Sequence, residues 1–196
     1  TGAGGEVVGN YATWNPLIGA NNQSGSETIF APSIVVLSNG NLNASNPTAG
    51  GQAPRMQVHS NVGMTSGKWY AEFTGISGRG AGISLGDYIP TSGSGSGVSN
   101  NIILQPTSGA VTATTGASAT ITGTAVAIST TDVVGVAFDV DNSTCYYYRN
   151  GALVQTASDI TTTLGAPYRS SGVWYFSSQP ESSGAPSAII ANFGQR

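Results

Sequence analysis

Few side chains in this sequence of 196 residues could take part in nucleophilic catalysis. His59 is the sole histidine and Cys145 is the sole cysteine. A nucleophile needs an oriented base beside it, yet the stretch around His59 contains neither a carboxylate nor a Gly-x-Ser-x-Gly motif. A single cysteine cannot form an internal disulfide or a cysteine-based metal site. We therefore interpret His59 as a strand or surface residue and predict that the chain is not an enzyme.

Two carboxylate patterns point to other chemistry. Glycoside hydrolysis needs two facing carboxyl groups, and Glu72 and Asp139 could meet across a sheet. The run Asp139-Val140-Asp141-Asn142 resembles the start of a calcium loop, but the glycine and the glutamate of such a loop are missing further along. Asp and Asn of this kind also cap chain reversals. We interpret the run as a turn and predict no catalytic residue, no metal ligand and no cofactor.

The charge pattern excludes further classes of function. Only 8% of the residues are charged, and six Lys and Arg against nine Asp and Glu give a net charge of -3. Nucleic-acid binding needs clustered cations, whereas Lys68 is the only lysine. No apolar run approaches the length of a membrane span, so we predict no membrane insertion. A surface rich in Gly, Ser, Thr and Asn is common among extracellular and virion proteins.

The sequence predicts strands almost everywhere and helices almost nowhere, because short β-branched or aromatic runs alternate with turn signals. The turn pairs Asn39-Gly40 and Asn150-Gly151 are typical of two-residue hairpins, and Thr112 to Thr131 predicts weak strands with small side chains. The other predicted strands are Ser33–Leu37, Trp69–Thr74, Val133–Val140, Cys145–Tyr148, Ala152–Gln155, Val173–Ser177 and Ser187–Phe193.

Many short strands with closely spaced turns favour an antiparallel sandwich or barrel whose aromatic side chains fill the space between sheets. Long loops rich in small residues are predicted at Gly19–Ser26, Ala44–Ala53 and Thr91–Asn100. Neither side of the last loop carries enough apolar sequence for a core of its own. We therefore predict one domain over residues 1–196.

Five segments, in order, resemble the motifs of SPRY domains. They are Gly67–Phe73, Val134–Asp139, Tyr146–Gly151, Trp174–Phe176 and the terminal Ala191–Gly194. The resemblance implies an all-β, antiparallel two-sheet sandwich of SPRY-like fold with little or no helix. Residues 67–196 would be the motif-bearing part, and residues 1–66 would supply lead-in strands and loops.

The N-terminal third resembles the lead-in of SPRY-like proteins from bacteriophages and metagenomes. The matching segments are Gly9–Leu17 and Leu37–Leu42. In that subset the domain belongs to virion structural proteins, often of the tail or its fibres, which implies location on the surface of an extracellular particle. Family members usually continue beyond Asn-Phe-Gly, so we expect this chain, from Thr1 to Arg196, to be a piece of a longer protein.

The resemblance also implies roles for single residues. Motif positions that pack between the sheets in SPRY folds are occupied here by Trp69, Phe73, Phe138, Tyr147 and Phe193. Turn or close-approach positions are occupied by Gly67, Gly135 and Gly151.

In SPRY domains, loops at one end of the sandwich form a shallow binding surface. The residues here that would contribute to it are Arg79, Asp87, Tyr88, Tyr168 and Trp174. Tyr and Arg are common anchors of interfaces, and the faces of Tyr and Trp rings also stack on sugars. The alternative for each residue is a side chain that packs within its own loop.

The leading functional hypothesis is a non-catalytic recognition module of a phage tail fibre or tail tip that binds a glycan, a protein or another component of the host surface. The alternative is a capsid decoration or fibre-forming subunit that assembles with itself and with other virion subunits, with Ile102–Leu104 as candidate contacts. A third hypothesis is an extracellular adhesin module encoded by a host. The first two both suit a homo-oligomer.

Overall fold

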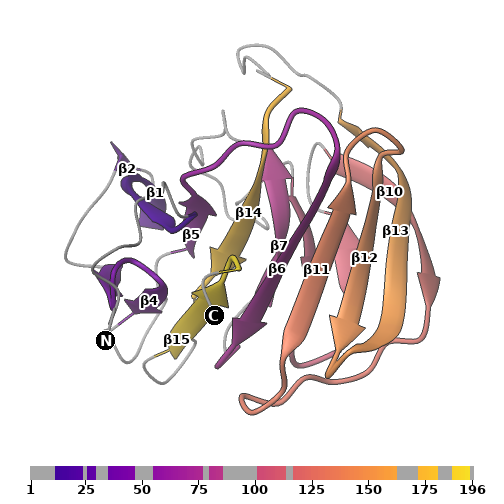
Figure 1. Ribbon diagram of the computed structural model, residues 1–196. Helices are drawn as coiled ribbons and strands as arrows, with labels where there is room; N and C mark the ends of the chain where they lie inside the picture. Colours follow the sequence, from indigo (N-terminus) through magenta and orange to yellow (C-terminus); the bar gives the residue numbers. More distant parts are fainter. Residues whose placement is uncertain are drawn as a thin grey trace, which may run out of the picture.

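The computed structural model describes residues 12–23, 26–29, 35–46, 55–76, 80–85, 101–113, 117–162, 172–180 and 187–194. These segments form strands and turns, and none of them forms a helix. The described residues therefore contain no helix that could cross a membrane. Fifteen described strands make two antiparallel sheets that lie one behind the other (Figure 1). The prediction of an all-β, two-sheet antiparallel sandwich is confirmed.

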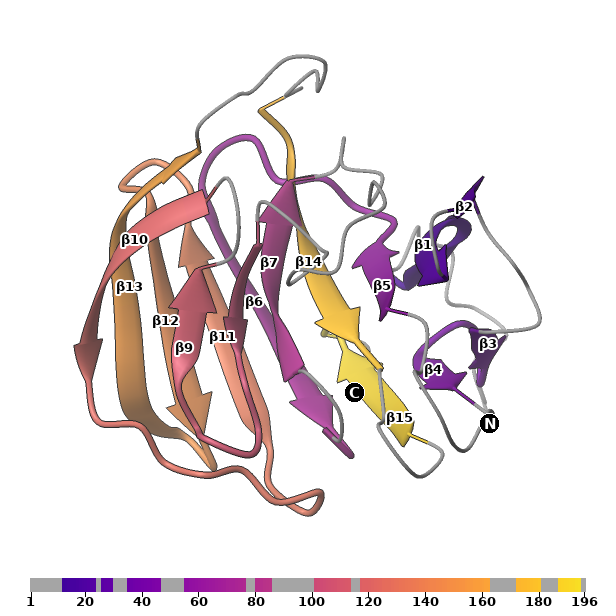
Figure 2. The same ribbon diagram turned by 180° about the vertical axis from the view of Figure 1, so that it is seen from behind.

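The seven-stranded sheet faces the viewer in Figure 2. Its order is β2 (Ser26–Ile29), β1 (Trp14–Gln23), β5 (Arg55–Ser60), β14 (Trp174–Gln179), β7 (Gly80–Leu85), β8 (Asn101–Leu104) and β9 (Val111–Ala113).

The eight-stranded sheet faces the viewer in Figure 1. Its order is β10 (Ala117–Gly123), β13 (Ala152–Thr162), β12 (Thr144–Arg149), β11 (Val134–Asp139), β6 (Lys68–Thr74), β15 (Ser187–Asn192), β4 (Asn43–Asn46) and β3 (Val36–Ser38). Strands from the N-terminal third pair with C-terminal ones in both sheets, β5 with β14 and β4 with β15.

The two Asn-Gly pairs make different turns. Asn150 and Gly151 have φ of 50° and 81° between the paired residues Arg149 and Ala152, which confirms a two-residue hairpin. The Asn39-Gly40 prediction was too short, because Ser38 pairs with Asn43 across four turn residues. Two carbonyls of that longer turn are used elsewhere, since Asn41 and Leu42 accept hydrogen bonds from the backbone N–H groups of Trp14 and Ala191.

The prediction of a loop over Gly19–Ser26 is wrong. The backbone continues β1 to Gln23 and pairs on both sides, with β2 and with β5. This segment has low strand propensity, so main-chain pairing with two neighbours, rather than the residue types, makes it a strand. The predicted loop Ala44–Ala53 begins inside β4, and its remainder lies outside the described residues, as does Thr91–Asn100.

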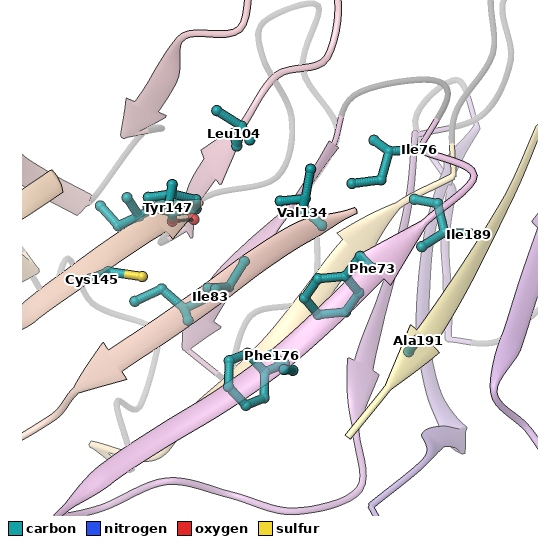
Figure 3. Close-up of a cluster of buried hydrophobic side chains, with 14 of the residues drawn as sticks. Phe73, Ile76, Ile83, Leu104, Val134, Cys145, Tyr147, Phe176, Ile189 and Ala191 are labelled. Atoms are coloured by element: carbon teal, nitrogen blue, oxygen red, sulfur yellow. Dashed lines mark hydrogen bonds between the residues drawn. The ribbon is translucent and has the colours of Figure 1, made fainter. Parts of the chain in front are cut away.

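Aromatic rings from both sheets fill the core (Figure 3). Phe73 of β6 stacks on Trp14 of β1 at 5.8 Å and meets Phe176 of β14 edge-on at 6.2 Å. The predicted core positions Phe138 and Tyr147 are fully buried as well. Phe193 is half-buried and closes the cluster, with its ring 5.4 Å from that of Trp14.

Trp69 corrects the prediction of a core tryptophan. Trp69 lies on the same side of β6 as the buried Ala71 and Phe73, yet 36% of its surface is exposed. Its indole N–H donates a hydrogen bond to the Ser66 carbonyl at 2.8 Å. This bond ties the ring to the turn before β6, and Trp69 is not among the buried residues of the core cluster.

Tyr147 links the two sheets by a hydrogen bond across the core. Its hydroxyl donates to the Ile102 carbonyl of β8 at 2.6 Å, and both residues are fully buried. Gln155 of β13 makes a second link, because its side-chain oxygen accepts from the Val111 N–H of β9 at 2.7 Å. Ile102–Leu104, considered above as subunit contacts, are all buried, and Ile102 and Leu104 belong to the core between the sheets.

We expect Tyr147→Phe to lower the free energy of unfolding by about 1–2 kcal/mol, because it removes one buried hydrogen bond while keeping the ring. Urea denaturation measures the change. The matched control is Tyr146→Phe, one residue away on the outer side of the same strand, which should change stability by less than about 0.5 kcal/mol. Equal effects of the two variants would contradict the role given to the Tyr147 hydroxyl.

Candidate functional site

Of the five predicted binding residues, the structure describes Trp174 alone. Trp174 opens β14, where its backbone exchanges hydrogen bonds of 2.7 and 3.0 Å with Met64. Its half-buried ring meets Phe138 edge-on at 5.5 Å. The side chain therefore lies at the margin of the core, partly packed and partly exposed. The other predicted residues, which lie outside the described part, are Arg79, Asp87, Tyr88 and Tyr168.

The described strand ends show where the segments that carry these residues are attached. Leu85, the last residue of β7, is the register partner of Trp174, the first residue of β14. Residues 86–100 follow the first and residues 163–171 precede the second, so both segments leave the same end of the sheet. Arg79 precedes Gly80, which pairs with Gln179 at the other end of these strands, about 17 Å away.

A cluster of uncharged polar side chains lies on the outer face of the seven-stranded sheet. The core residues Val58, Ile83 and Phe176 point inward from β5, β7 and β14, so their neighbours point outward. These neighbours are nevertheless buried. We call them the outer polar cluster, which consists of Gln57, His59, Ser84, Asn101, Ser177 and Gln179.

Gln57 is the centre of the hydrogen bonding in the outer polar cluster. Its side-chain oxygen accepts from the amide groups of Asn101 and Gln179, each at 3.4 Å. Its amide nitrogen donates to Nε2 of His59 at 2.5 Å. The Tyr175 ring stacks on the imidazole with centroids 5.8 Å apart and planes 13° apart. The arrangement is neutral, ordered and rich in amide and hydroxyl groups.

His59 lies in a strand, one of the two places expected for it, but the other residues of this cluster were not predicted from the sequence, although one signal was present. Gly82-Ile83-Ser84-Leu85-Gly86 matches the Gly-x-Ser-x-Gly pattern of a nucleophile elbow. The structure places the Ser84 hydroxyl 2.9 Å from Nε2 of His59, to which it donates. A serine and a histidine therefore meet, as they would in a hydrolase. The rest of the cluster carries no motif and could be found only from the register of four strands.

The Ser84–His59 pair lacks the other requirements of an activated nucleophile. Ser84 lies within β7 at an ordinary negative φ, not on a strained turn. Burial lowers the pKa of His59 from 6.5 to about 4, which makes it a weak base near neutral pH. Among the described residues no partner binds Nδ1 of His59 or the Ser177 hydroxyl. No carboxylate therefore orients the imidazole within this part of the chain.

The described residues offer no evident metal centre. No group of three or more His, Cys, Asp or Glu comes together in this part of the chain. Asp139 instead caps the turn predicted for it, because its two carboxylate oxygens accept from the backbone and side-chain N–H groups of Asn142 at 3.1 and 2.9 Å. Burial raises the pKa of the Cys145 thiol to about 12, so it remains protonated.

Comparison with known proteins gives likeness in structure alone. The SPRY domain of human HERC1 matches with a TM-score of 0.56 and 14% identity, over 93% of this chain and 99% of that one. The PSpry domain of TRIM65 gives 0.48, 12%, 93% and 92%, and stonustoxin gives 0.45, 19%, 93% and 27%. No protein-family model and no curated protein matches the sequence. The first likeness confirms that the fold is SPRY-like.

The buried His59 predicts a pH dependence of stability. The unfolded chain takes up a proton near pH 6.5, whereas the folded chain takes it up near pH 4. The unfolded state therefore binds more protons between these values, and acidification from pH 6.5 to 4 should lower the free energy of unfolding by about 3 kcal/mol. Urea denaturation at several pH values should show this slope in the wild type and not in His59→Gln. Equal slopes would contradict the assignment.

Proposed function

We propose that this chain is a non-catalytic recognition domain of a bacteriophage virion, in a tail fibre or tail tip, that binds a glycan or another component of the host surface. The SPRY-like fold is often a protein-interaction module. The phage context is supported by the resemblance of residues 9–17 and 37–42 to phage lead-in segments. The observation that carries the proposal is the pairing of Leu85 with Trp174.

That pairing matters because the segments attached to Leu85 and to Trp174 join the sheet at the same end. The segment after Leu85 contains Asp87 and Tyr88, and the segment before Trp174 contains Tyr168. Binding residues are commonly held on loops by a rigid scaffold. The outer polar cluster lies on β5, β14, β7 and β8 of this sheet, and its amide groups link β5 to β8 and to β14. Many copies on a particle would add avidity to weak single contacts.

The described carboxylates also support a non-catalytic role. Glu72 pairs in register with Gly135, whereas Asp139 lies four residues further along β11, about 13 Å away. Glycosidases hold their two carboxyl groups closer than about 10 Å. Asp139 is moreover engaged by Asn142 and by Lys68 at 3.1 Å. These two acids therefore do not form a hydrolytic pair.

A structural subunit remains the alternative proposal, and one edge strand favours it. β10, at the edge of the eight-stranded sheet, has seven residues without proline or charge. Such an edge is a template for pairing with another chain. A stable oligomer that binds no cells would favour this assembly role, whereas a monomer that binds cells would favour recognition. Light scattering after size-exclusion chromatography measures the oligomeric state.

The recognition proposal predicts that Tyr88→Ala combined with Tyr168→Ala lowers binding to host cells by at least about tenfold, since aromatic anchors carry much of an interface's energy. Flow cytometry with the labelled domain and a panel of bacteria measures the binding. Thr107→Ala is the matched control, because this exposed turn residue follows β8 at the opposite end of the sheet. A double variant that binds as the wild type does would refute the site.

The non-catalytic assignment has a separate test. We expect Ser84 to stay unlabelled by a fluorophosphonate probe at pH 7–8, because it is buried and its histidine is a weak base. Mass spectrometry of the intact folded protein detects the adduct. Labelling that disappears in Ser84→Ala and in His59→Gln would show an activated serine and overturn the assignment.

A further inference from the structure

The outer face of the eight-stranded sheet presents three tyrosines to solvent. Side chains alternate along each strand, and the inward positions of β6, β11 and β12 fill the core. The outward positions of β6 and β12 include Tyr70, Tyr146 and Tyr148, which we call the tyrosine face. Tyr70 is 52% exposed, and the other two are half-buried. Figure 1 looks onto this face, where β6, β11 and β12 lie side by side.

The central strand of the tyrosine face carries small residues. Ala137 of β11 lies in register between Tyr70 and Tyr146, and Gly135 lies between Glu72 and Tyr148. A methyl group added to Gly135 would stand 2.5 Å from the Tyr70 hydroxyl oxygen and 3.1 Å from the ring. The Tyr70 side chain therefore leans across β11 and does not stand away from the sheet. The aromatic surface therefore lies close to the backbone of the sheet.

Polar contacts, one of them an ion pair, engage the charged groups of this face. The Glu72 carboxylate accepts a hydrogen bond from the Tyr70 hydroxyl at 3.0 Å and one from the Asn192 amide at 3.3 Å. Lys68 is paired with Asp139 at 3.1 Å. Burial, and then the hydrogen bond to Glu72, raise the pKa of Tyr70 to about 12, so its hydroxyl is neutral under ordinary conditions. The Glu72 carboxylate therefore keeps its negative charge, which disfavours an anionic chain and leaves a neutral one acceptable.

We propose that the tyrosine face binds a neutral saccharide chain, with sugar rings stacked on Tyr70 and Tyr148 and sugar hydroxyls bonded to Glu72 and Asn192. A pyranose ring has an apolar face of C–H groups and an edge of hydroxyls. The face suits an exposed aromatic ring. The edge suits a carboxylate, whose oxygens can each accept more than one hydrogen bond. The inference takes only its ligand class from the proposed function, because the surface lies on the opposite sheet.

The test is a pull-down of the full chain with insoluble neutral polysaccharides: cellulose, chitin, mannan and β-1,3-glucan. We expect the wild type to be retained by at least one of them. Tyr70→Ala and Tyr148→Ala should each weaken retention by at least about tenfold. Tyr70→Phe keeps the stacking ring and should stay within about threefold of the wild type. Circular dichroism checks that each variant is folded.

Two further variants sharpen the test. Gly135→Ala keeps every tyrosine but pushes the Tyr70 ring away from the sheet, so it should weaken retention as Tyr70→Ala does. Its backbone tolerates alanine because its φ is not positive. Val36→Ala is the matched control, since Val36 is 42% exposed on β3 at the far edge of the same sheet. This control should bind as the wild type does.

Several results would overturn the inference. They are a wild type retained by none of the four polysaccharides, retention by charged chitosan or hyaluronan alone, and unchanged retention in the Tyr70→Ala and Tyr148→Ala variants. Retention lost in the Tyr88→Ala/Tyr168→Ala double variant but kept in Tyr70→Ala would place the sugar at the loop end. That outcome would support the proposed function while refuting the tyrosine face. Retention kept in the Tyr88→Ala/Tyr168→Ala double variant but lost in Tyr70→Ala would support the tyrosine face and refute only the site formed by Tyr88 and Tyr168.

Discussion

Phe73 holds the sandwich together through rings that come from distant parts of the chain. Trp14 stacks on it from the seven-stranded sheet, Phe176 meets its edge, and Phe193 lies 6.1 Å away at the end of β15. These contacts join the first described strand to the last ones. Such long-range packing fixes which side of every strand faces inward. Because side chains alternate, it also fixes which residues face outward.

The two outward faces have opposite character although one core sets both. On the seven-stranded sheet the outward residues include amides, hydroxyls and His59, which are buried, and most of them are hydrogen-bonded to one another. On the eight-stranded sheet they include Tyr70, whose ring lies across Gly135 with half its surface free. The first face is a rigid, neutral layer that braces four strands. The second is an aromatic surface open to solvent, so the two faces suit different roles.

The sequence predicted what depends on local chemistry and alternation, and it failed where distant strands decide. Asn150-Gly151 forms its hairpin because positive φ at both residues matches the twist of the strands it joins. Trp69 has the expected inward parity but lies at the start of its strand, where its indole bonds to the Ser66 carbonyl and stays partly exposed. Ser84 and His59 are 25 residues apart, and their contact follows only from the order β5-β14-β7. Periodicity carries no information on that order.

The scarcity of charge gives these observations a common consequence. Asp132 accepts hydrogen bonds from Ser129, Arg149 and Asn150, which together hold the pKa of its carboxyl well below the usual range. It thereby ties the Asn150-Gly151 turn to the start of β11. Lys68 is paired with Asp139 in the same way, whereas Glu72 accepts hydrogen bonds from the neutral Tyr70 and Asn192. The pairs Asp132–Arg149 and Asp139–Lys68 thus serve the fold and add little field for steering a charged partner. With only 8% charged residues in the sequence, the recognition proposed above would rest on shape, stacking and hydrogen bonds more than on charge.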